Sequence, residues 1–270
     1  MKKRGEKVIK GRVQWRKEKE VHKLRIVLTV VAVFLCASVG AGAFLVWRQW
    51  DANRKAVQEA VAKVSAASAG PGEASAQTGD DRDLLLVNSS RRVPENYRPS
   101  LTGYGGVQVD SRILPALKKM MGDAASAGYP LKLRSGYVDE KSQETLYQAE
   151  VKRLTTEQKM SRVFAENKAQ STVGRGGYNE NQTGLAVEFA AAGEKAGQSF
   201  AQTGQYRWLV SNCVNYGFIL RYPDGKESVT EVEPNPAHFR YVGSAHAVQM
   251  RAYAMCLEEY AAYLSDRSDS

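Results

Sequence analysis

Histidine is scarce in this sequence. The 270 residues include only three histidines, His22, His238 and His246. Neither His22 nor His246 stands at the spacing from His238 that two ligands on one structural element would need. The sequence therefore offers no compact histidine motif of the kind that binds a metal ion.

Cysteine is equally scarce, with three residues in the chain. Cys36 lies in an apolar run near the N-terminus, so at most one disulfide remains for the rest of the protein. Cys213 and Cys256 fall on the apolar faces of two predicted helices. An exported protein could join them, but buried free thiols are the simpler interpretation.

Most of the chain also has almost no net charge. The formal charge is +9, but residues 1–25 contain 11 Lys and Arg against 3 Asp and Glu, which leaves 27 basic and 26 acidic residues elsewhere. A nucleic-acid-binding domain would carry its basic charge on the folded part, so we exclude that class. The chain has no internal repeat. It has no phosphate-binding loop either, because glycine-rich residues 171–177 follow no predicted strand and precede no Gly-Lys-Ser/Thr.

Residues 26–47 form an apolar run without a charged side chain. A helix of this length spans about 33 Å, enough for the hydrocarbon core of a bilayer. The basic excess before it places the N-terminus in the cytoplasm, with Trp47 and Trp50 at the far interface. A cleaved signal peptide is the alternative, because residues 41–43 (AGA) resemble a cleavage site. The 25-residue leader is long for a signal peptide and favours a retained anchor.

The chain divides into five predicted parts. Residues 65–81 are rich in Ala, Gly and Ser, as expected of a flexible linker. The parts are a basic cytoplasmic tail (1–25), a transmembrane helix (26–47), a helical stalk and linker (48–82), a folded extracytoplasmic domain (83–266) and a short tail (267–270).

Hydrophobic spacing and turn residues predict the elements of the folded domain. The predicted helices are 113–127, 141–169, 205–216 and 244–264. The predicted strands are 131–136, 185–190, 218–222 and 229–242, with a strand or extended arm at 84–87 and a loop at 98–106. Strands and helices do not alternate strictly. The fold class is therefore α+β, with a central antiparallel sheet and flanking helices.

Residues 178–190 predict a loop that runs into a strand. The odd-numbered positions from Leu185 to Phe189 are apolar and share one face, while Glu188 lies between two alanines on the other. A carboxylate between small neighbours is typical of the floor of a cleft. A solvent-facing glutamate on a half-buried strand fits the pattern equally well.

A second stretch, residues 230–243, has the same two-faced character. His238 and Arg240 share one face of the predicted strand, and two aromatic residues occupy the other. This separation predicts a sheet with one packed face and one face that lines a site. A single strand histidine with a purely structural role is the alternative.

These two stretches resemble the VanY-type D-alanyl-D-alanine carboxypeptidases, zinc peptidases that trim peptidoglycan stem peptides. The family's first metal motif, Ser-x-His-x-x-Gly-x-Ala-x-Asp, corresponds to residues 179–188 (NENQTGLAVE). The second, Glu-Pro-Trp-His-Phe-Arg-Tyr-Val-Gly, corresponds to residues 235–243 (NPAHFRYVG). Together with similar segments such as 216–223 (YGFILRYP), the resemblance covers about residues 84–264. It implies a D-Ala-D-Ala carboxypeptidase-like fold.

The resemblance implies that Asn181, Glu188 and His238 occupy the zinc-ligand positions, where the family has His, Asp and His. Only His238 is retained. An amide oxygen is a poor substitute for imidazole, and glutamate is one methylene longer than aspartate. We therefore expect zinc to be absent or weakly bound.

The remaining site positions also depart from the family pattern. Asn235 stands where the family has its catalytic glutamate, and an amide cannot accept a proton from water. Glu233 is the alternative base. Val138 stands where the family has a substrate-site arginine. The other implied substrate-binding positions are Ser135, Tyr137, Gln143 and Arg240.

Two hypotheses of different class follow. The first is a membrane-anchored pseudoenzyme of the bacterial cell envelope that binds peptidoglycan stem peptide or a protein partner. The second is a divergent metallo-carboxypeptidase with Glu188, His238 and either Glu180 or Asn181 around the metal. A structural envelope protein without a ligand also stays open. Metal content would discriminate between the first two.

Overall fold

The computed structural model describes residues 81–193 and 199–268. The predicted cytoplasmic tail, transmembrane helix and stalk lie outside these residues. Within them, no helix is both long enough and apolar enough to cross a membrane.

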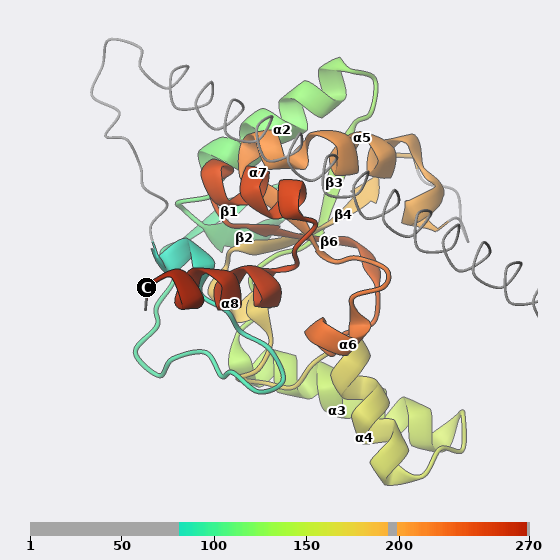
Figure 1. Cartoon of the computed structure of the whole chain (residues 1–270). Helices are drawn as coiled ribbons and strands as arrows, with labels where there is room; N and C mark the ends of the chain where they lie inside the picture. The colour runs from blue at the N-terminus through green and yellow to red at the C-terminus, as the bar shows by residue number, and fades with distance from the viewer. Residues whose placement is uncertain (1–80, 194–198, 269–270) are drawn as a thin grey trace, which may run out of the picture. The chain divides into compact units, whose positions relative to one another are not determined.

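A four-stranded antiparallel sheet forms the centre of the described domain (Figure 1). Its strands, in spatial order, are β3 (Leu131–Ser135), β4 (Ala186–Ala191), β6 (Asn235–Tyr241) and β5 (Phe218–Tyr222). Helices flank this sheet, which confirms the predicted α+β class with a central antiparallel sheet.

The register between β4 and β6 brings the two sequence motifs side by side. Glu188 is the direct partner of His238, and Ala186 is the direct partner of Arg240. Directly opposed residues on antiparallel strands have their side chains on the same face. The carboxylate and the imidazole therefore start from adjacent positions in the middle of the sheet.

Three helices lie together on one side of the sheet: α2 (Leu114–Ser126), α5 (Gly204–Asn212) and α7 (Ser244–Tyr253) (Figure 1). Leu117 of α2, Leu209 of α5 and Met250 of α7 are buried in one apolar core with the strand aromatics Phe189 and Phe239. Short 3-10 helices complete the domain: η1 (Asp81–Leu84), η2 (Glu180–Thr183), η3 (Phe200–Gln202) and η4 (Cys213–Tyr216). Cys213 and Cys256 are buried free thiols, as predicted.

The predicted loop at 98–106 is wrong, because most of it belongs to a hairpin. Strands β1 (Leu101–Tyr104) and β2 (Val107–Asp110) pair around Gly105 and Gly106. Both glycines have positive φ angles, 59° and 86°. A two-residue turn that matches the twist of a hairpin needs positive φ at both positions, which glycine adopts without strain.

Two predicted helices are each divided in two. The predicted helix 141–169 is an antiparallel pair, α3 (Glu140–Thr156) and α4 (Arg162–Thr172), with Lys159 at a φ of 56° between them. The predicted helix 244–264 is α7 followed by α8 (Leu257–Ser268), separated at Ala254 with a φ of 51°. Hydrophobic periodicity did not reveal these breaks, because neither break contains glycine or proline.

The predicted strand 229–242 is shorter than expected. Its first residues form a single helical turn, α6 (Glu227–Thr230), which ends at Glu231 with a φ of 58°. Strand β6 begins only at Asn235, after Pro234. The predicted strand or arm at 84–87 contains the end of η1 and then residues without regular structure.

A glycine substitution tests the packing between β5, β6 and α7. Gly217 and Gly225 share a φ of 80°, but a Cβ at Gly217 would lie 2.7 Å from the Tyr241 ring, whereas a Cβ at Gly225 meets nothing within 4 Å. Left-handed backbone costs an L-residue about 1–2 kcal/mol, and overpacking adds about 1–3 kcal/mol. In urea unfolding of the full-length protein, Gly217→Ala should lose about 1–3 kcal/mol more stability than Gly225→Ala. Equal losses would contradict this packing.

Candidate active-site cleft

A cavity of about 180 Å³ lies over the face of the sheet that carries Glu188 and His238. The end of α4, the segment before β4 and the segment before β6 supply most of its walls. The side chains that line it include Gln170, Tyr178, Asn181, Glu188, Tyr222, Glu233, Asn235 and His238.

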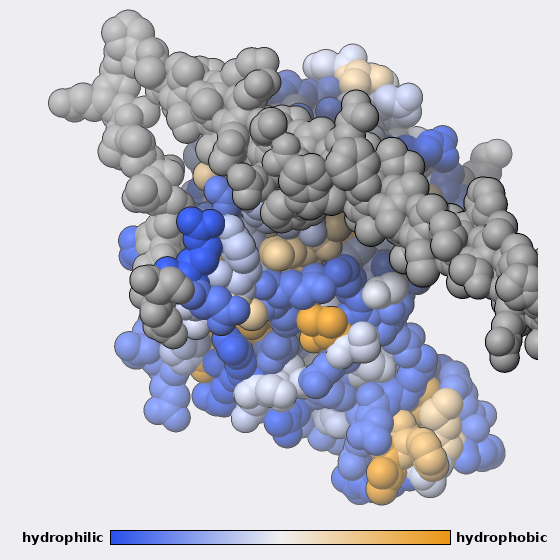
Figure 2. Space-filling model, viewed as in Figure 1, coloured by the Kyte–Doolittle hydropathy of each residue, from blue (hydrophilic) through white to orange (hydrophobic). Residues whose placement is uncertain are grey.

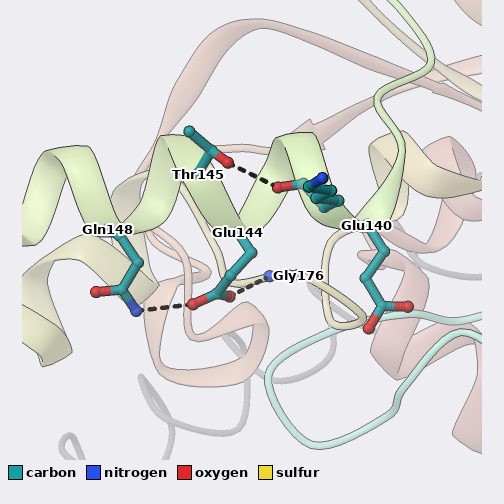
Figure 3. A pocket seen from close by; sticks show the side chains of 6 residues that line it. Glu140, Glu144, Thr145, Gln148 and Gly176 are labelled. Atoms are coloured by element: carbon teal, nitrogen blue, oxygen red, sulfur yellow. Dashed lines mark hydrogen bonds between the residues drawn. The ribbon is translucent and has the colours of Figure 1, made fainter.

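A second hollow lies on the outer side of α3 and involves none of these residues (Figure 3). Of its two carboxylates, Glu140 pairs with Arg92, and Glu144 accepts hydrogen bonds from Gln148 and from the backbone N–H of Gly176. The contact with Gly176 fastens the loop that follows α4 to α3. We therefore assign this hollow a structural origin.

His238 sits between two carboxylates. Its Nε2 lies 2.9 Å from Oε1 of Glu180, and its Nδ1 lies 3.6 Å from Oε1 of Glu188. The ring packs against Tyr222, with ring centroids 5.1 Å apart. Burial by itself would lower the pKa of His238, but the contacts with Glu180 and Glu188 outweigh it and raise that pKa. The imidazole is therefore fixed in orientation and its charged form is favoured.

Glu180 anchors this arrangement from beneath. Its side chain is fully buried, and its Oε2 accepts from Nε of Arg221 at 2.8 Å and from a terminal nitrogen of Arg240 at 3.3 Å. Burial opposes the charged form, but Arg221 together with His238 and Arg240 holds the pKa of Glu180 well below its usual value. Arg221 also binds Glu258 of α8 through two hydrogen bonds of 2.7 and 2.9 Å. One carboxylate thus connects η2, β5 and β6.

Glu188 is held from both sides by donors of its own chain. Its Oε1 accepts a hydrogen bond of 3.0 Å from Nδ2 of Asn235, and its Oε2 accepts from Arg134 at 3.0 and 3.2 Å. Burial by itself would raise the pKa of Glu188, but the contacts with His238 and Arg134 outweigh burial and lower that pKa to about 2. Both oxygens of this ionised carboxylate are therefore engaged.

The positions predicted as metal ligands meet at the cleft. Asn181, Glu188 and His238 all line it, and so does Asn235. The backbone N–H of Val138 donates to the carbonyl of Asn181, so this position adjoins the site. Within residues 81–193 and 199–268, no cluster of three His, Cys, Asp or Glu side chains could hold a metal ion. The donors present are the imidazole of His238, the carboxylates of Glu188 and Glu233, each already paired within the chain, and neutral amides. This set does not fit zinc.

Two residues predicted as alternatives have other contacts. Glu233 lines the cleft, but its carboxylate forms an ion pair with Lys168 and its backbone N–H donates to Ser171. Glu180 is not available as a replacement ligand, because Arg221, Arg240 and His238 already occupy its oxygens.

Two of the predicted substrate-binding positions, Arg240 and Gln143, have buried side chains. Arg240 is fully buried and donates to Glu180 and to the carbonyls of Asp83 and Leu85, and its role as a substrate contact stays a prediction. Gln143 is also buried, and its Nε2 donates to two loop carbonyls, those of Val173 and Gly174. It supports the cleft wall instead of lining the cavity.

Ser135 and Tyr137 adjoin the cleft without lining the cavity. Ser135 pairs with Glu188 across β3 and β4, and the backbone N–H of Tyr137 donates to Gln108. The roles assigned to Ser135, Tyr137 and Val138 stay predictions.

Sequence reasoning missed Arg134 and Arg221 as site residues. Arg134 lies beside Glu188 because β3 and β4 are neighbours, a pairing that the sequence does not encode locally. With Lys132 two residues earlier, Arg134 follows the pattern of a solvent-facing edge. Arg221 lay within a segment that resembled the family, but strand alternation alone gave no reason to bury a guanidinium.

Comparison with known proteins identifies relatives of this chain. Residues 106–244 match the VanY family of D-alanyl-D-alanine carboxypeptidases. A D-alanyl-D-alanine carboxypeptidase of Enterococcus faecalis is 34% identical over 190 residues, which cover 68% of each chain.

Solved structures that resemble this chain include VanY proteins. A crystal structure of a vancomycin-resistance D,D-pentapeptidase VanY mutant in complex with Zn(II) is 32% identical, with a TM-score of 0.61 over 66% of this chain and 98% of that one. A structure of VanYB in complex with D-alanine-D-alanine has the same identity and TM-score, and covers 66% and 96% of the two chains.

The buried network makes a direct stability prediction. Glu180→Gln removes the charge that compensates Arg221 and Arg240, and breaking a buried ion pair costs about 3–5 kcal/mol. The matched control, Glu166→Gln, removes only an exposed pair with Arg162, which is worth about 0.3–0.5 kcal/mol. Chemical unfolding should show this difference. A Glu180→Gln protein as stable as the control would show that Glu180 does not hold the site together.

Proposed function

Because the chain belongs to the VanY family of D-alanyl-D-alanine carboxypeptidases, we propose that it is a membrane-anchored pseudoenzyme of the cell envelope. Its cleft binds peptidoglycan stem peptide and does not hydrolyse it. The family is one of cell-wall peptidases. We propose that this chain has kept the peptide-binding cleft and lost the hydrolytic activity.

The state of Glu188 carries the proposal. Asn235 and Arg134 donate to its two oxygens, so a metal ion would have to compete with these donors for the carboxylate. Neutral Asn181 stands at the position of the family's first histidine and adds no comparable donor. The site thereby satisfies its own charges without an ion.

Asn235 removes the second requirement for hydrolysis. It stands where the family has its catalytic glutamate, and an amide cannot take up a proton near neutral pH. Its Nδ2 donates to Glu188 and its Oδ1 accepts from the backbone N–H of Ala237. Glu233 does not replace the lost base, since it is paired with Lys168.

The retained scaffold supports a binding role. The ion pairs from Glu180 to Arg221, Arg240 and His238 stabilise the cleft floor, and the cavity above it remains open. A related protein, VanYB, is known in complex with D-alanine-D-alanine. A stem peptide is therefore the first ligand to test, ahead of an envelope protein, for which no contact argues specifically.

The anchor rests on the sequence. Residues 26–47 are apolar and uncharged, and residues 1–25 carry a net charge of +8 from 11 basic and 3 acidic side chains. Under the positive-inside rule the domain lies outside the cytoplasm, on a single-pass anchor.

Metal analysis and an activity assay test the central proposal. After dialysis against a mild chelator, the purified full-length protein should retain well under one zinc per chain and release no D-Ala from stem peptide. Asn181→His with Glu188→Asp should restore zinc binding. Addition of Asn235→Glu should then produce carboxypeptidase activity, because a general base contributes about 10²–10⁴-fold. Val138→Arg should increase that activity further.

Two results would contradict the proposal. Full zinc occupancy, with D-Ala release that is lost in His238→Ala, would establish the divergent metallo-carboxypeptidase instead. A triple variant that folds but binds no zinc would show that the cleft differs from the family in more than these side chains.

The anchor has its own test. Protease added to intact protoplasts should remove the domain, while residues before the apolar run stay protected until the cells are lysed. A domain that is protected in intact protoplasts, or that occurs mainly free in the medium, would refute the membrane anchor.

A further inference from the structure

The charged side chains that line the cleft are already paired within the chain. Glu188 is paired with Arg134 at 3.0 Å, and Glu233 with Lys168. His238 is paired with Glu180 at 2.9 Å. A charged group of a ligand would therefore meet no uncompensated opposite charge among the lining residues.

The lining side chains that lack a hydrogen-bond partner are all uncharged. Within the part of the chain that the structure describes, the side-chain polar groups of Asn181, Gln170, Tyr178 and Tyr222 make no hydrogen bond. Amides and hydroxyls can both donate and accept. They match a peptide group, which has one donor and one acceptor, better than they match a carboxylate, which only accepts.

From this distribution we infer that the cleft selects an uncharged peptide end. Its ligand is a stem peptide whose terminal carboxyl has become an amide, either a primary carboxamide or the peptide bond of a cross-link. A free D-Ala carboxylate is disfavoured. This inference rests on the proposed function, because it specifies which peptide the same cleft takes.

Desolvation gives the physical reason. A carboxylate that enters the cleft loses hydration, and an ionised group regains that free energy only from a matched partner. Here it would also approach the carboxylates of Glu188 and Glu233. Outside the lining, Arg175 lies 4.0 Å over the Tyr178 ring, and it is the cation that could reverse this preference.

Titration calorimetry with three synthetic peptides tests the inference. The probes are diacetyl-Lys-D-Ala-D-Ala with a free carboxylate, the same peptide as a carboxamide, and the same peptide as an N-methylamide. The full-length protein should bind the carboxamide at least tenfold more tightly than the carboxylate. Comparable binding of the N-methylamide would point to cross-links as the source, and its exclusion would point to primary carboxamides. Mass spectrometry of the recovered peptides checks for hydrolysis.

Variants connect the preference to the cleft. Glu233→Gln leaves Lys168 without its partner and should strengthen carboxylate binding about tenfold. Glu166→Gln, which breaks an exposed pair with Arg162 near the start of α4, should change nothing. Asn181→Leu should weaken binding of the amide peptides about tenfold while the far-ultraviolet circular dichroism stays unchanged.

The possible failures are distinguishable. Equal or tighter binding of the carboxylate would overturn the inference and leave the proposed function standing, and loss of that binding in Arg175→Gln would identify the residue responsible. Binding of none of the peptides at millimolar concentration would overturn both. Hydrolysis of the carboxylate peptide would overturn the pseudoenzyme itself.

Discussion

The buried carboxylate of Glu180 is the group on which the rest of this site depends. It is fully enclosed, yet it accepts from Arg221, Arg240 and His238. A buried ion is tolerated only when its partners are in place, so this cluster fixes η2 against β5 and β6 and orients the imidazole. A carboxylate that holds the outer nitrogen of a histidine is the usual support for a metal-binding imidazole. Glu180 supports Nε2 of His238 in this way here.

The cleft above this support pairs its charged groups within the chain. Glu188 faces His238 across the β4–β6 register, but Asn235 and Arg134 donate to its two oxygens. The intact floor explains how the protein keeps its relatives' fold. The occupied carboxylate explains why we assign the cleft to binding.

Figure 2 shows that most of the visible surface of the described domain is hydrophilic, with apolar side chains gathered mainly toward the end of the α3–α4 pair.

Sequence reasoning predicted what short-range patterns encode. Alternation in residues 185–190 placed Glu188 opposite an apolar face, and the resemblance to the VanY family implied that His238 lies beside it. It gave no information where a side chain's partners come from a distant element: the burial of Arg240 depends on Glu180 and on the carbonyls of residues 83 and 85. The helix breaks were missed because Lys159 and Ala254 adopt positive φ without the usual glycine signal.

A crystal structure of the protein grown with excess zinc and stem peptide would test the central claim most directly. The account predicts peptide density in the cleft, an unbroken hydrogen bond between Asn235 and Glu188, and no anomalous zinc peak beside His238. An anomalous peak between Nδ1 of His238 and the Glu188 carboxylate, with Asn235 and Arg134 displaced from that carboxylate, would contradict it.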